Sequence, residues 1–215
     1  VIPDPGKILC IGLNYASHIS EMGRESVGYP AVFTRWSDTL IADGEPLVRP
    51  REGLEFDFEG ELAVIIGKAG RRIAVADALN HVAGYSIFHD ASLRDWQRHN
   101  TQFTPGKNYP ATGGFGPELV TPDEIPDLAG QRVQTRLNGE LMQDQPIADM
   151  ICSVAEIIAY CSTFTPLSPG DVIATGTPGG VGLGRTPPVF MQPGDHAEVS
   201  IGMIGTLRNP VVAEP

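Results

Sequence analysis

The sequence predicts a strand-dominated α+β fold in a single domain over residues 1–215. Glycine and proline contribute 25 and 19 residues, which favours many turns and short strands over long helices. Alternating apolar and polar positions recur along the chain, whereas the three-and-four spacing of an amphipathic helix is sustained only over 148–163. The hydrophobic fraction of 41% and the charged fraction of 19% are typical of globular proteins and exclude a disordered chain.

Charge and cysteine content narrow the partners and the compartment. A net charge of −11 repels polyanions, so we expect no nucleic-acid partner. No apolar run reaches the ~18 residues of a membrane span, and we expect no membrane association. Cys10, Cys152 and Cys161 form no CxxC pair, so neither a disulfide framework nor a thiolate zinc site is indicated. These features favour a cytoplasmic protein.

The first 122 residues are expected to form short strands separated by turns and brief helices. An opening strand at 7–13 leads to a helical turn or two at 15–22, and then to a mobile loop at 23–30. The remaining elements expected in this half are strands at 31–34, 47–48, 56–66 and 82–88, helices at 73–80 and 92–99, and a loop-rich stretch at 101–122.

The carboxyl-terminal half carries the clearest local signals. Alternating Val133, Thr135 and Leu137 lead into Asn138-Gly139, which is typical of a type I′ hairpin. Apolar residues within 148–163 predict the one substantial helix, whose apolar face is expected to pack in the core. The elements expected after it are strands at 172–175, 197–201, 206–207 and 211–212, with a polar glycine-rich run at 176–182.

An acidic segment is the first candidate for chemistry. In a strand, alternation would place four carboxylates on one face at spacings of roughly 6 to 7 Å: Glu55, Asp57, Glu59 and Glu61. Like charges so spaced raise one another's pKa unless water or a divalent cation compensates them. Asp90 closes a later strand and could add a further carboxylate. Such a set favours Mg²⁺ or Mn²⁺ over zinc, although the segment alone is more typical of a solvated acidic face.

A histidine and a glutamate three residues apart form the second candidate. On a helical turn, Glu21 would lie beside His18, fix its tautomer and raise its basicity, as a general base acting on water requires. The same spacing is common in ordinary surface pairs. The other histidines show no spacing to a second ligand type and are expected to be structural or exposed: His81, His89, His99 and His196.

Two turn sequences could contact an anionic substrate. Lys107 lies in the turn 104–108, which could hold its ammonium group inward, although lysines in such turns are more often solvated. The run 176–182 lacks the endings of phosphate and dinucleotide loops, so no nucleotide is implied. Its backbone N–H groups and the Thr177 hydroxyl could still bind a carboxylate.

Considered together, these segments resemble the C-terminal catalytic domain of the fumarylacetoacetate hydrolase family over nearly the whole chain. The resemblance is most distinctive at Pro169-Gly170-Asp171-Val172-Ile173-Ala174-Thr175-Gly176-Thr177-Pro178. The other matching motifs, in order, are Cys10-Ile11-Gly12-Leu13-Asn14-Tyr15, His18 with Glu21, Phe58-Glu59-Gly60-Glu61-Leu62, Gly84-Tyr85, Asp90 with Arg94, Asp95 and Gln97, Gly106-Lys107, Leu137-Asn138-Gly139-Glu140 and Gly205-Thr206-Leu207-Arg208-Asn209-Pro210-Val211.

The resemblance implies mixed β-sheets rolled around a central metal site, usually in a homodimer. Carried over by motif position, the ligands of Mg²⁺ or Mn²⁺ are Glu59, Glu61 and Asp90. Asp57 and Glu55 are then either solvated or placed behind the ligands.

The resemblance also implies roles for residues around the metal. His18 and Glu21 match a water-activating dyad on a lid, here about residues 15–30. Lys107 matches a lysine that neutralises charge near the metal. The residues that match substrate-binding or supporting groups are Arg94, Gln97 and Thr177.

This chain departs from the family pattern at a few positions. Arg35 stands where many members have lysine, and Asn108-Tyr109-Pro110 and Gly202-Met203 replace more usual residues. The metal triad is unaffected by these changes, whereas the identity of the substrate is left open.

The preferred function at this stage is metal-dependent hydrolysis of a carbon–carbon bond in a 2,4-diketo acid such as an acylpyruvate or fumarylpyruvate. His18 would activate water for attack on C4, and the leaving pyruvate enolate would be stabilised by the metal and Lys107. The alternative is decarboxylation of oxaloacetate or isomerisation of an unsaturated 2-hydroxy dioic acid from aromatic breakdown. A third possibility is a non-catalytic binding protein for small keto acids.

Overall fold

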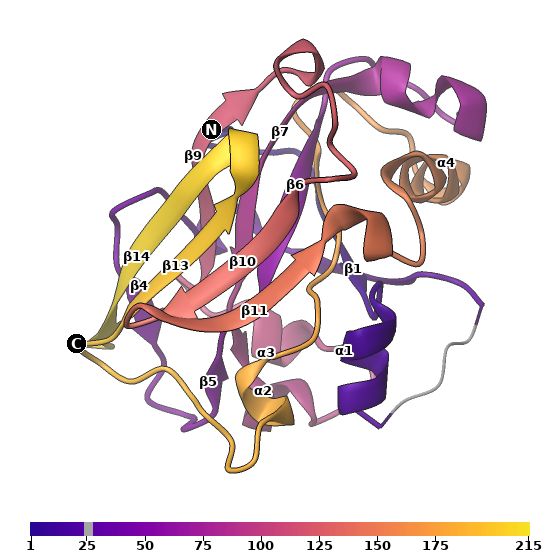
Figure 1. The fold of residues 1–215 in the computed structure, drawn as a ribbon. Coiled ribbons are helices and arrows are strands. Elements are labelled where there is room, and N and C mark those ends of the chain that lie inside the picture. Colours follow the sequence, from indigo (N-terminus) through magenta and orange to yellow (C-terminus); the bar gives the residue numbers. More distant parts are fainter. Residues whose placement is uncertain (24–27) are drawn as a thin grey trace.

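The computed structural model of the protein describes residues 1–23 and 28–215, and two mixed β-sheets form its body (Figure 1). The larger sheet has seven strands in the spatial order β2 (Ala31–Arg35), β1 (Ile8–Gly12), β12 (Val172–Ala174), β6 (Gly60–Ile66), β7 (Val82–Asp90), β9 (Gly113–Val120) and β3 (Leu40–Ile41). The second sheet has five, in the order β11 (Glu140–Pro146), β10 (Arg132–Leu137), β13 (His196–Ile201), β14 (Gly205–Ala213) and β4 (Leu47–Arg49). A short ribbon pairs β5 (Phe56–Asp57) with β8 (Ser92–Leu93).

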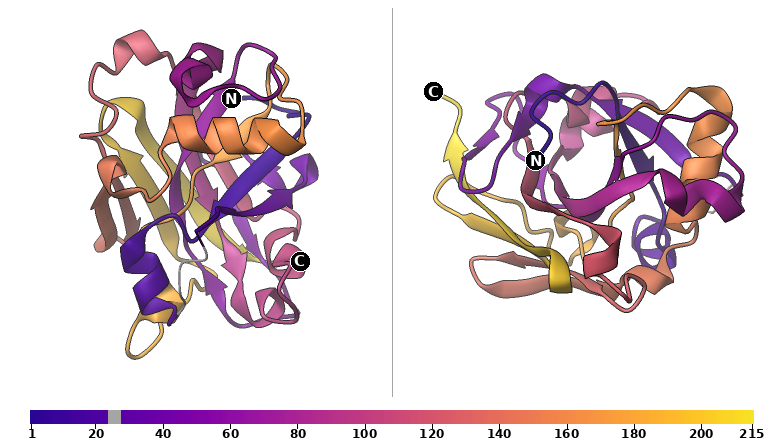
Figure 2. Two further views of the ribbon diagram at one scale, coloured as in Figure 1. Left: turned by 90° about the vertical axis from the view of Figure 1, so that its right-hand side faces the viewer. Right: turned by 90° about the horizontal axis from the view of Figure 1, so that it is seen from above.

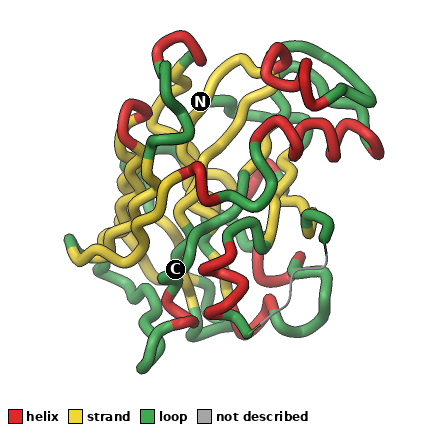
Figure 3. The backbone as a smooth tube through the Cα atoms, turned by 45° about the vertical axis from the view of Figure 1, so that its right-hand side comes forward, coloured by secondary structure: helices red, strands yellow, loops and turns green. Residues whose placement is uncertain are grey.

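Short helices lie mainly at the two ends of the strands (Figure 3). The α-helices are α1 (Ala16–Glu21), α2 (Arg94–Gln97), α3 (Thr104–Lys107) and α4 (Val154–Phe164). The 3₁₀ turns are η1 (Ser37–Thr39), η2 (Val75–His81), η3 (Pro122–Glu124), η4 (Ile147–Asp149), η5 (Gly182–Gly184) and η6 (Gly202–Ile204). Helices α1, α2 and α3 gather at the end opposite α4 (Figure 1), which separates the candidate site from the longest helix.

Strand β6 shows how the larger sheet creates two environments. Its residues Leu62, Val64 and Ile66 belong to the core between the sheets, which also contains Val133 of β10 and Val199 of β13. The alternate residues point to the opposite face, where a second apolar cluster forms beside the acidic residues. Seen from above, the sheets curl around one another (Figure 2), so both faces of β6 are buried.

The strand-dominated α+β prediction and most element positions are confirmed. The hairpin turn has Asn138 and Gly139 at φ of 53° and 84°, both left-handed as a type I′ turn requires. Its strands pair Leu137 with Glu140. The expected short strands at 206–207 and 211–212 join into the single strand β14.

Several predicted boundaries were wrong for identifiable reasons. The helix expected at 148–163 begins only at Val154, because Ser153 accepts a hydrogen bond from the Glu156 backbone and Glu156 accepts one from the Ser153 backbone. The loop-rich stretch 101–122 contains β9, whose glycines suggested a loop; a side chain at Gly114 would lie 2.8 Å from Asn209 Oδ1.

Three further elements differ from expectation. The helix expected at 73–80 is the 3₁₀ turn η2, and the one expected at 92–99 is divided between β8 and α2. The strand expected at 56–66 breaks between β5 and β6, and its residues from Phe56 onward are buried, so the solvated acidic face is wrong. Of the loop expected at 23–30, residues 24–27 lie outside the described residues.

Candidate active site

Three buried carboxylates converge where β6 and β7 meet the break after β5. One oxygen from each of Glu59, Glu61 and Asp90 lies within 4.8 Å of the others, and all three residues are buried. Antiparallel pairing sets Glu61 opposite Phe88, so Glu61 and Asp90 project from the same face of the sheet. The Asp90 backbone N–H donates to the Glu59 carbonyl at 2.9 Å, which holds the third carboxylate against them.

Three buried cations surround this acidic triad. Lys107 Nζ donates to Glu59 Oε2 at 2.7 Å and to Asp90 Oδ2 at 2.6 Å. Arg94 lies 2.6 Å from Glu59 Oε1, and Arg35 donates to Asp90 Oδ1 at 2.5 Å. Lys107 therefore points inward, as the family resemblance implied and contrary to the solvated position more usual for a lysine in such a turn, and it is almost completely buried.

The triad carries the electrostatics of a cation site. Burial alone would raise the pKa of Glu59, but Lys107 and Arg94 lower it to about 2. Glu61 has no such partner: burial, then Asp90 and Glu59, raise its pKa well above its ordinary value. Among the described residues, its one hydrogen bond comes from the Gly176 backbone N–H at 2.8 Å. Three converging carboxylates with one uncompensated negative charge fit a hard divalent cation.

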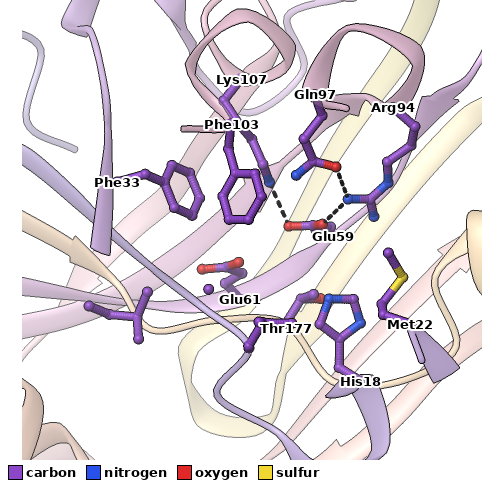
Figure 4. Close-up of a pocket in the computed structure, with 13 residues that line it drawn as sticks. His18, Met22, Phe33, Glu59, Glu61, Arg94, Gln97, Phe103, Lys107 and Thr177 are labelled. Atoms are coloured by element: carbon purple, nitrogen blue, oxygen red, sulfur yellow. Dashed lines mark hydrogen bonds and ion pairs between the residues drawn. The ribbon is translucent and has the colours of Figure 1, made fainter. Parts of the chain in front are cut away.

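The predicted dyad lies across the pocket from Lys107 (Figure 4). His18 Nδ1 and Glu21 Oε1 are 2.8 Å apart on α1, and His18 is buried. The carboxylates of Glu59 and Glu61 lie between His18 and the opposite wall formed by Phe33, Phe103 and Lys107 (Figure 4). The remaining residues that line the pocket are Ile11, Gly12, Leu13, Met22, Arg94, Gln97 and Thr177.

The glycine-rich run does not offer the free N–H groups that the sequence suggested. Three of its backbone N–H groups bind carboxylates of this chain: Gly176 binds Glu61, Gly180 binds Glu21, and Gly182 binds Asp57. The N–H of Leu183, the next residue, also binds Asp57. The prediction that the N–H groups of this run bind a substrate carboxylate is thus wrong for Gly176, Gly180 and Gly182. The run instead joins the acidic triad to the dyad.

Thr177 and Gln97 line the pocket with defined partners. The Thr177 hydroxyl donates to the Gly60 carbonyl at 3.0 Å and accepts from Gln143 Nε2 at 2.8 Å. Gln97 Oε1 accepts from Arg94 at 2.9 Å. Sequence reasoning missed Gln143, because only pairing of β11 with β10 brings residue 143 to Gly60, to whose backbone N–H it is also bonded.

The two remaining acidic residues of the segment 55–61 lie in different environments. Asp57 is fully buried and accepts from Arg94 Nε at 2.8 Å, so it lies behind Arg94 rather than in solvent. Glu55 pairs with Arg98 at 2.6 Å in a partly exposed bridge. His89 is buried, and neither of its ring nitrogens has a hydrogen-bond partner within the described part of the chain. His99 and His196 are exposed, as expected.

Comparison with known proteins shows to which family this chain belongs. The sequence model described as "Fumarylacetoacetate (FAA) hydrolase C-terminal" matches residues 7–212. The chain belongs to the fumarylacetoacetate hydrolase family. The family assignment and the rolled-sheet fold predicted from the motifs are thereby confirmed, and the chain is an enzyme of this family.

Three members of the fumarylacetoacetate hydrolase family illustrate the likeness. The chain is 45% identical over 215 residues to oxaloacetate tautomerase YisK of Bacillus subtilis, covering 98% of this chain and 71% of that protein. A fumarylacetoacetate hydrolase structure from Exiguobacterium antarcticum is 42% identical with a TM-score of 0.90, covering 99% and 76%. A 2-hydroxyhepta-2,4-diene-1,7-dioate isomerase from Mycobacterium marinum is 32% identical with a TM-score of 0.87, covering 99% and 76%.

None of the helices within residues 1–23 and 28–215 combines the length and apolar character needed to cross a bilayer.

Proposed function

We propose that this chain is a divalent-metal-dependent tautomerase that interconverts the enol and keto forms of a 2-keto dicarboxylic acid such as oxaloacetate. The observation that carries the proposal is one pocket that combines the acidic triad with the His18–Glu21 dyad. Relatives named oxaloacetate tautomerase and dienedioate isomerase support it. They favour the enol chemistry of the sequence-based alternative over the hydrolysis that was preferred.

The chain's residues divide the work of a proton transfer. Mg²⁺ or Mn²⁺ held by Glu59, Glu61 and Asp90 would supply a Lewis acid for the substrate's oxygens and for the negative charge of its enolate. Because Glu21 engages Nδ1 of His18, Nε2 is the atom left to exchange a proton with the substrate.

The cations and hydroxyl of the pocket would hold the substrate. Lys107 fixes Glu59 and Asp90 in place and balances their charge. Arg94, Gln97 and Thr177 face the pocket, and we assign them to the carboxylate and keto oxygens of the substrate. Arg94 Nη2 is buried and has no hydrogen-bond partner among the described residues, as a donor for a bound anion requires.

The arrangement of the whole enzyme follows the same proposal. We assign the catalytic function to one domain over residues 1–215 and the lid to about residues 15–30, of which the structure describes 15–23 and 28–30. A homodimer remains a prediction from the family resemblance, and sedimentation equilibrium tests it.

Hydrolysis of an acylpyruvate is the second candidate. Its support is the 42% identity to a protein named fumarylacetoacetate hydrolase. The same dyad could direct a water molecule instead of exchanging a proton with the substrate.

One assay separates the candidates. Loss of enol absorbance would be followed for oxaloacetate, acetylpyruvate and fumarylpyruvate with Mg²⁺, Mn²⁺ or chelator, and products would be identified by NMR. We expect chelator-sensitive ketonisation of enol oxaloacetate without release of pyruvate. Cleavage of the diketo acids into pyruvate and an acid would establish the hydrolase instead, and pyruvate with CO₂ from oxaloacetate would establish a decarboxylase.

The variant His18→Ala tests the role of the dyad. Turnover should fall by about 10²- to 10⁴-fold, while the affinity for Mn²⁺ stays that of the wild type because His18 is not a ligand. Unchanged turnover would remove the dyad from the mechanism.

A further inference from the structure

Asp57 is a buried carboxylate for which neither the family resemblance nor the proposed chemistry has a defined use. It lies at the end of β5, where it pairs with Ser92 of β8, and its side chain is completely inaccessible. We propose that Asp57 is a positioning residue that couples the acidic triad to the His18–Glu21 dyad, through Arg94 on one side and the glycine-rich run on the other. The link to catalysis rests on the proposed function, whereas the link to metal affinity does not.

The first arm of this coupling reaches the metal ligands. Asp57 Oδ2 accepts from Arg94 Nε at 2.8 Å, and the same guanidinium lies 2.6 Å from Glu59 Oε1. Arg94 is buried, so its orientation is set by these partners and Gln97 rather than by water. Because the guanidinium is planar, its hydrogen bond to Asp57 at Nε also fixes the direction in which Nη1 points toward Glu59.

The second arm reaches the dyad. Asp57 Oδ1 accepts from the Gly182 N–H at 2.7 Å, and Oδ2 accepts from the Leu183 N–H at 3.0 Å. Two residues earlier, the Gly180 N–H donates to Glu21 Oε2 at 2.8 Å, while Glu21 Oε1 contacts His18. The run that Asp57 anchors therefore also sets the position of Glu21.

The hydrogen-bond inventory requires a carboxylate at this position. Asp57 receives four N–H donors, two on each oxygen, the fourth being the Phe58 backbone N–H at 2.8 Å. An amide of the same shape offers one oxygen acceptor, so asparagine would place its NH₂ against two N–H donors. The glycine-rich run passes close to this carboxylate, because a Cβ at residue 182 would lie 2.6 Å from Asp57 Oδ1 and closer still to the Val189 carbonyl oxygen.

A matched control lies at the far end of β12 from Gly176. Asp171 is equally buried, accepts from Lys7 Nζ at 2.8 Å and from the Ser168 N–H at 2.8 Å, and touches neither the triad nor the dyad. Asp171→Asn therefore removes a buried, cation-paired carboxylate without entering the proposed coupling.

The experiment compares Asp57→Asn with Asp171→Asn in the purified full chain. Mn²⁺ affinity is measured by electron paramagnetic resonance, and kcat and KM for enol oxaloacetate are measured at saturating Mn²⁺. We expect Asp57→Asn to weaken Mn²⁺ binding by about 10- to 100-fold and to lower kcat even when Mn²⁺ saturates. Asp171→Asn should change Mn²⁺ affinity by less than about twofold, because it is not linked to a ligand.

Two double-mutant cycles show whether the effects travel along the proposed arms. Asp57→Asn should weaken Mn²⁺ binding less in an Arg94→Lys background, and should lower kcat less in a His18→Ala background, than in the wild type. Additive effects in both cycles, wild-type Mn²⁺ affinity in Asp57→Asn, or an equal loss in Asp171→Asn would each overturn the proposal.

Further variants cover the case in which Asp57→Asn does not fold. Arg185 donates to the Gly180 carbonyl at 3.1 Å and to the Met142 carbonyl at 2.7 Å, so Arg185→Gln loosens the run without touching Asp57. It should lower kcat at saturating Mn²⁺ and leave Mn²⁺ affinity unchanged, whereas Arg94→Lys should weaken Mn²⁺ binding. The opposite pattern would contradict the two arms. If wild-type enzyme showed no turnover, the proposed function would fail while the Mn²⁺ measurements still tested the metal arm.

Discussion

The two faces of strand β6 use the same alternation for opposite purposes. On one face, Leu62 packs between the two sheets in an apolar cluster. On the other, Glu61 points into a pocket with two more carboxylates. Leu62 is 0% exposed and Glu61 is 2% exposed. Burial alone therefore does not distinguish a residue of the apolar core from a residue of the candidate site. What distinguishes Glu61 is a buried carboxylate that forms no ion pair with a cation of the described residues.

The charged face contains one more acid than base. The buried carboxylates of Asp57, Glu59, Glu61 and Asp90 face the buried cations Arg35, Arg94 and Lys107. The excess is concentrated at Glu61, whose pKa is raised by burial, Asp90 and Glu59. We infer that this face lowers the stability of the metal-free protein, and that a bound divalent cation reverses the effect.

The largest effect is expected from Glu61→Gln. Removal of this proposed metal ligand should abolish the acceleration that depends on the metal and the dyad together, lowering turnover by more than about 10⁴-fold. In the metal-free protein, however, the same substitution should not lower the free energy of unfolding and should raise it at high pH. The folded state binds the Glu61 proton more tightly than the unfolded chain does, so the wild type loses stability as pH rises from the ordinary carboxyl range through the raised pKa.

Chemical denaturation of both proteins with chelator checks this sign. At pH 8 the free energy of unfolding of Glu61→Gln should equal or exceed that of the wild type, and added Mn²⁺ should stabilise only the wild type. A variant less stable than the wild type with chelator would show that Glu61 supports the fold.

Leu62→Ala should show the reverse behaviour one residue away. Deleting this buried side chain from the core between the sheets should lower the free energy of unfolding by about 2–5 kcal/mol, because the rigid strands cannot close the cavity. Mn²⁺ affinity of the folded protein should stay within about threefold of the wild type, since Leu62 points away from the triad. Titration with Mn²⁺ below the denaturation midpoint measures it; a large loss of affinity would mean that the two faces are not independent.

The apolar face was largely predictable from sequence, and the charged face was predictable only in part. Alternation located β6 and β10, and Asn138-Gly139 located the hairpin, because these signals are local. The residues of the acidic triad, the dyad and Lys107 were recognised from motifs. The break between β5 and β6 was not, because it depends on pairing of Phe56 and Asp57 with Leu93 and Ser92 of β8.

The connections among site residues could not be predicted from local patterns. Asp57 meets the Gly182 N–H across 125 residues, and Gln143 meets Gly60 across 83. Nothing in either segment alone indicates its partner. The glycine-rich run was considered as a carboxylate-binding site for the same reason: its composition shows that N–H groups are present, but not that the chain's own carboxylates occupy them.

A smaller effect on stability is expected at the start of α4, whose buried apolar residues belong to the same apolar cluster as Leu62. Ser153→Ala removes the capping interaction with Glu156 and should lower the free energy of unfolding by about 1 kcal/mol. Turnover should be unchanged, because α4 lies at the end of the strands away from α1 (Figure 1). Urea denaturation and the enol assay measure the two quantities on one preparation; reduced turnover would reveal a link between the ends.

The smallest effects are expected in the reactivity of the three cysteines, which lie in different environments. Cys161 lies in the apolar cluster, where burial raises its pKa to about 12. Relative to the ordinary value of 9.0, that shift leaves ~10³-fold less thiolate at pH 8. Burial, then Asp90 and Glu61, raise the pKa of Cys10 on the charged face. Cys152 is only partly buried.

Iodoacetamide at pH 8 should therefore alkylate Cys152 first, and Cys10 and Cys161 only on unfolding. Peptide mass spectrometry over a time course identifies the modified residue. Cys161 is protected by burial in the apolar cluster that also contains Leu62, and Glu61 does not belong to that cluster. Leu62→Ala should therefore speed alkylation of Cys161, whereas Glu61→Gln should not. Equal acceleration in both variants would show that the two faces open together, as one cooperative unit.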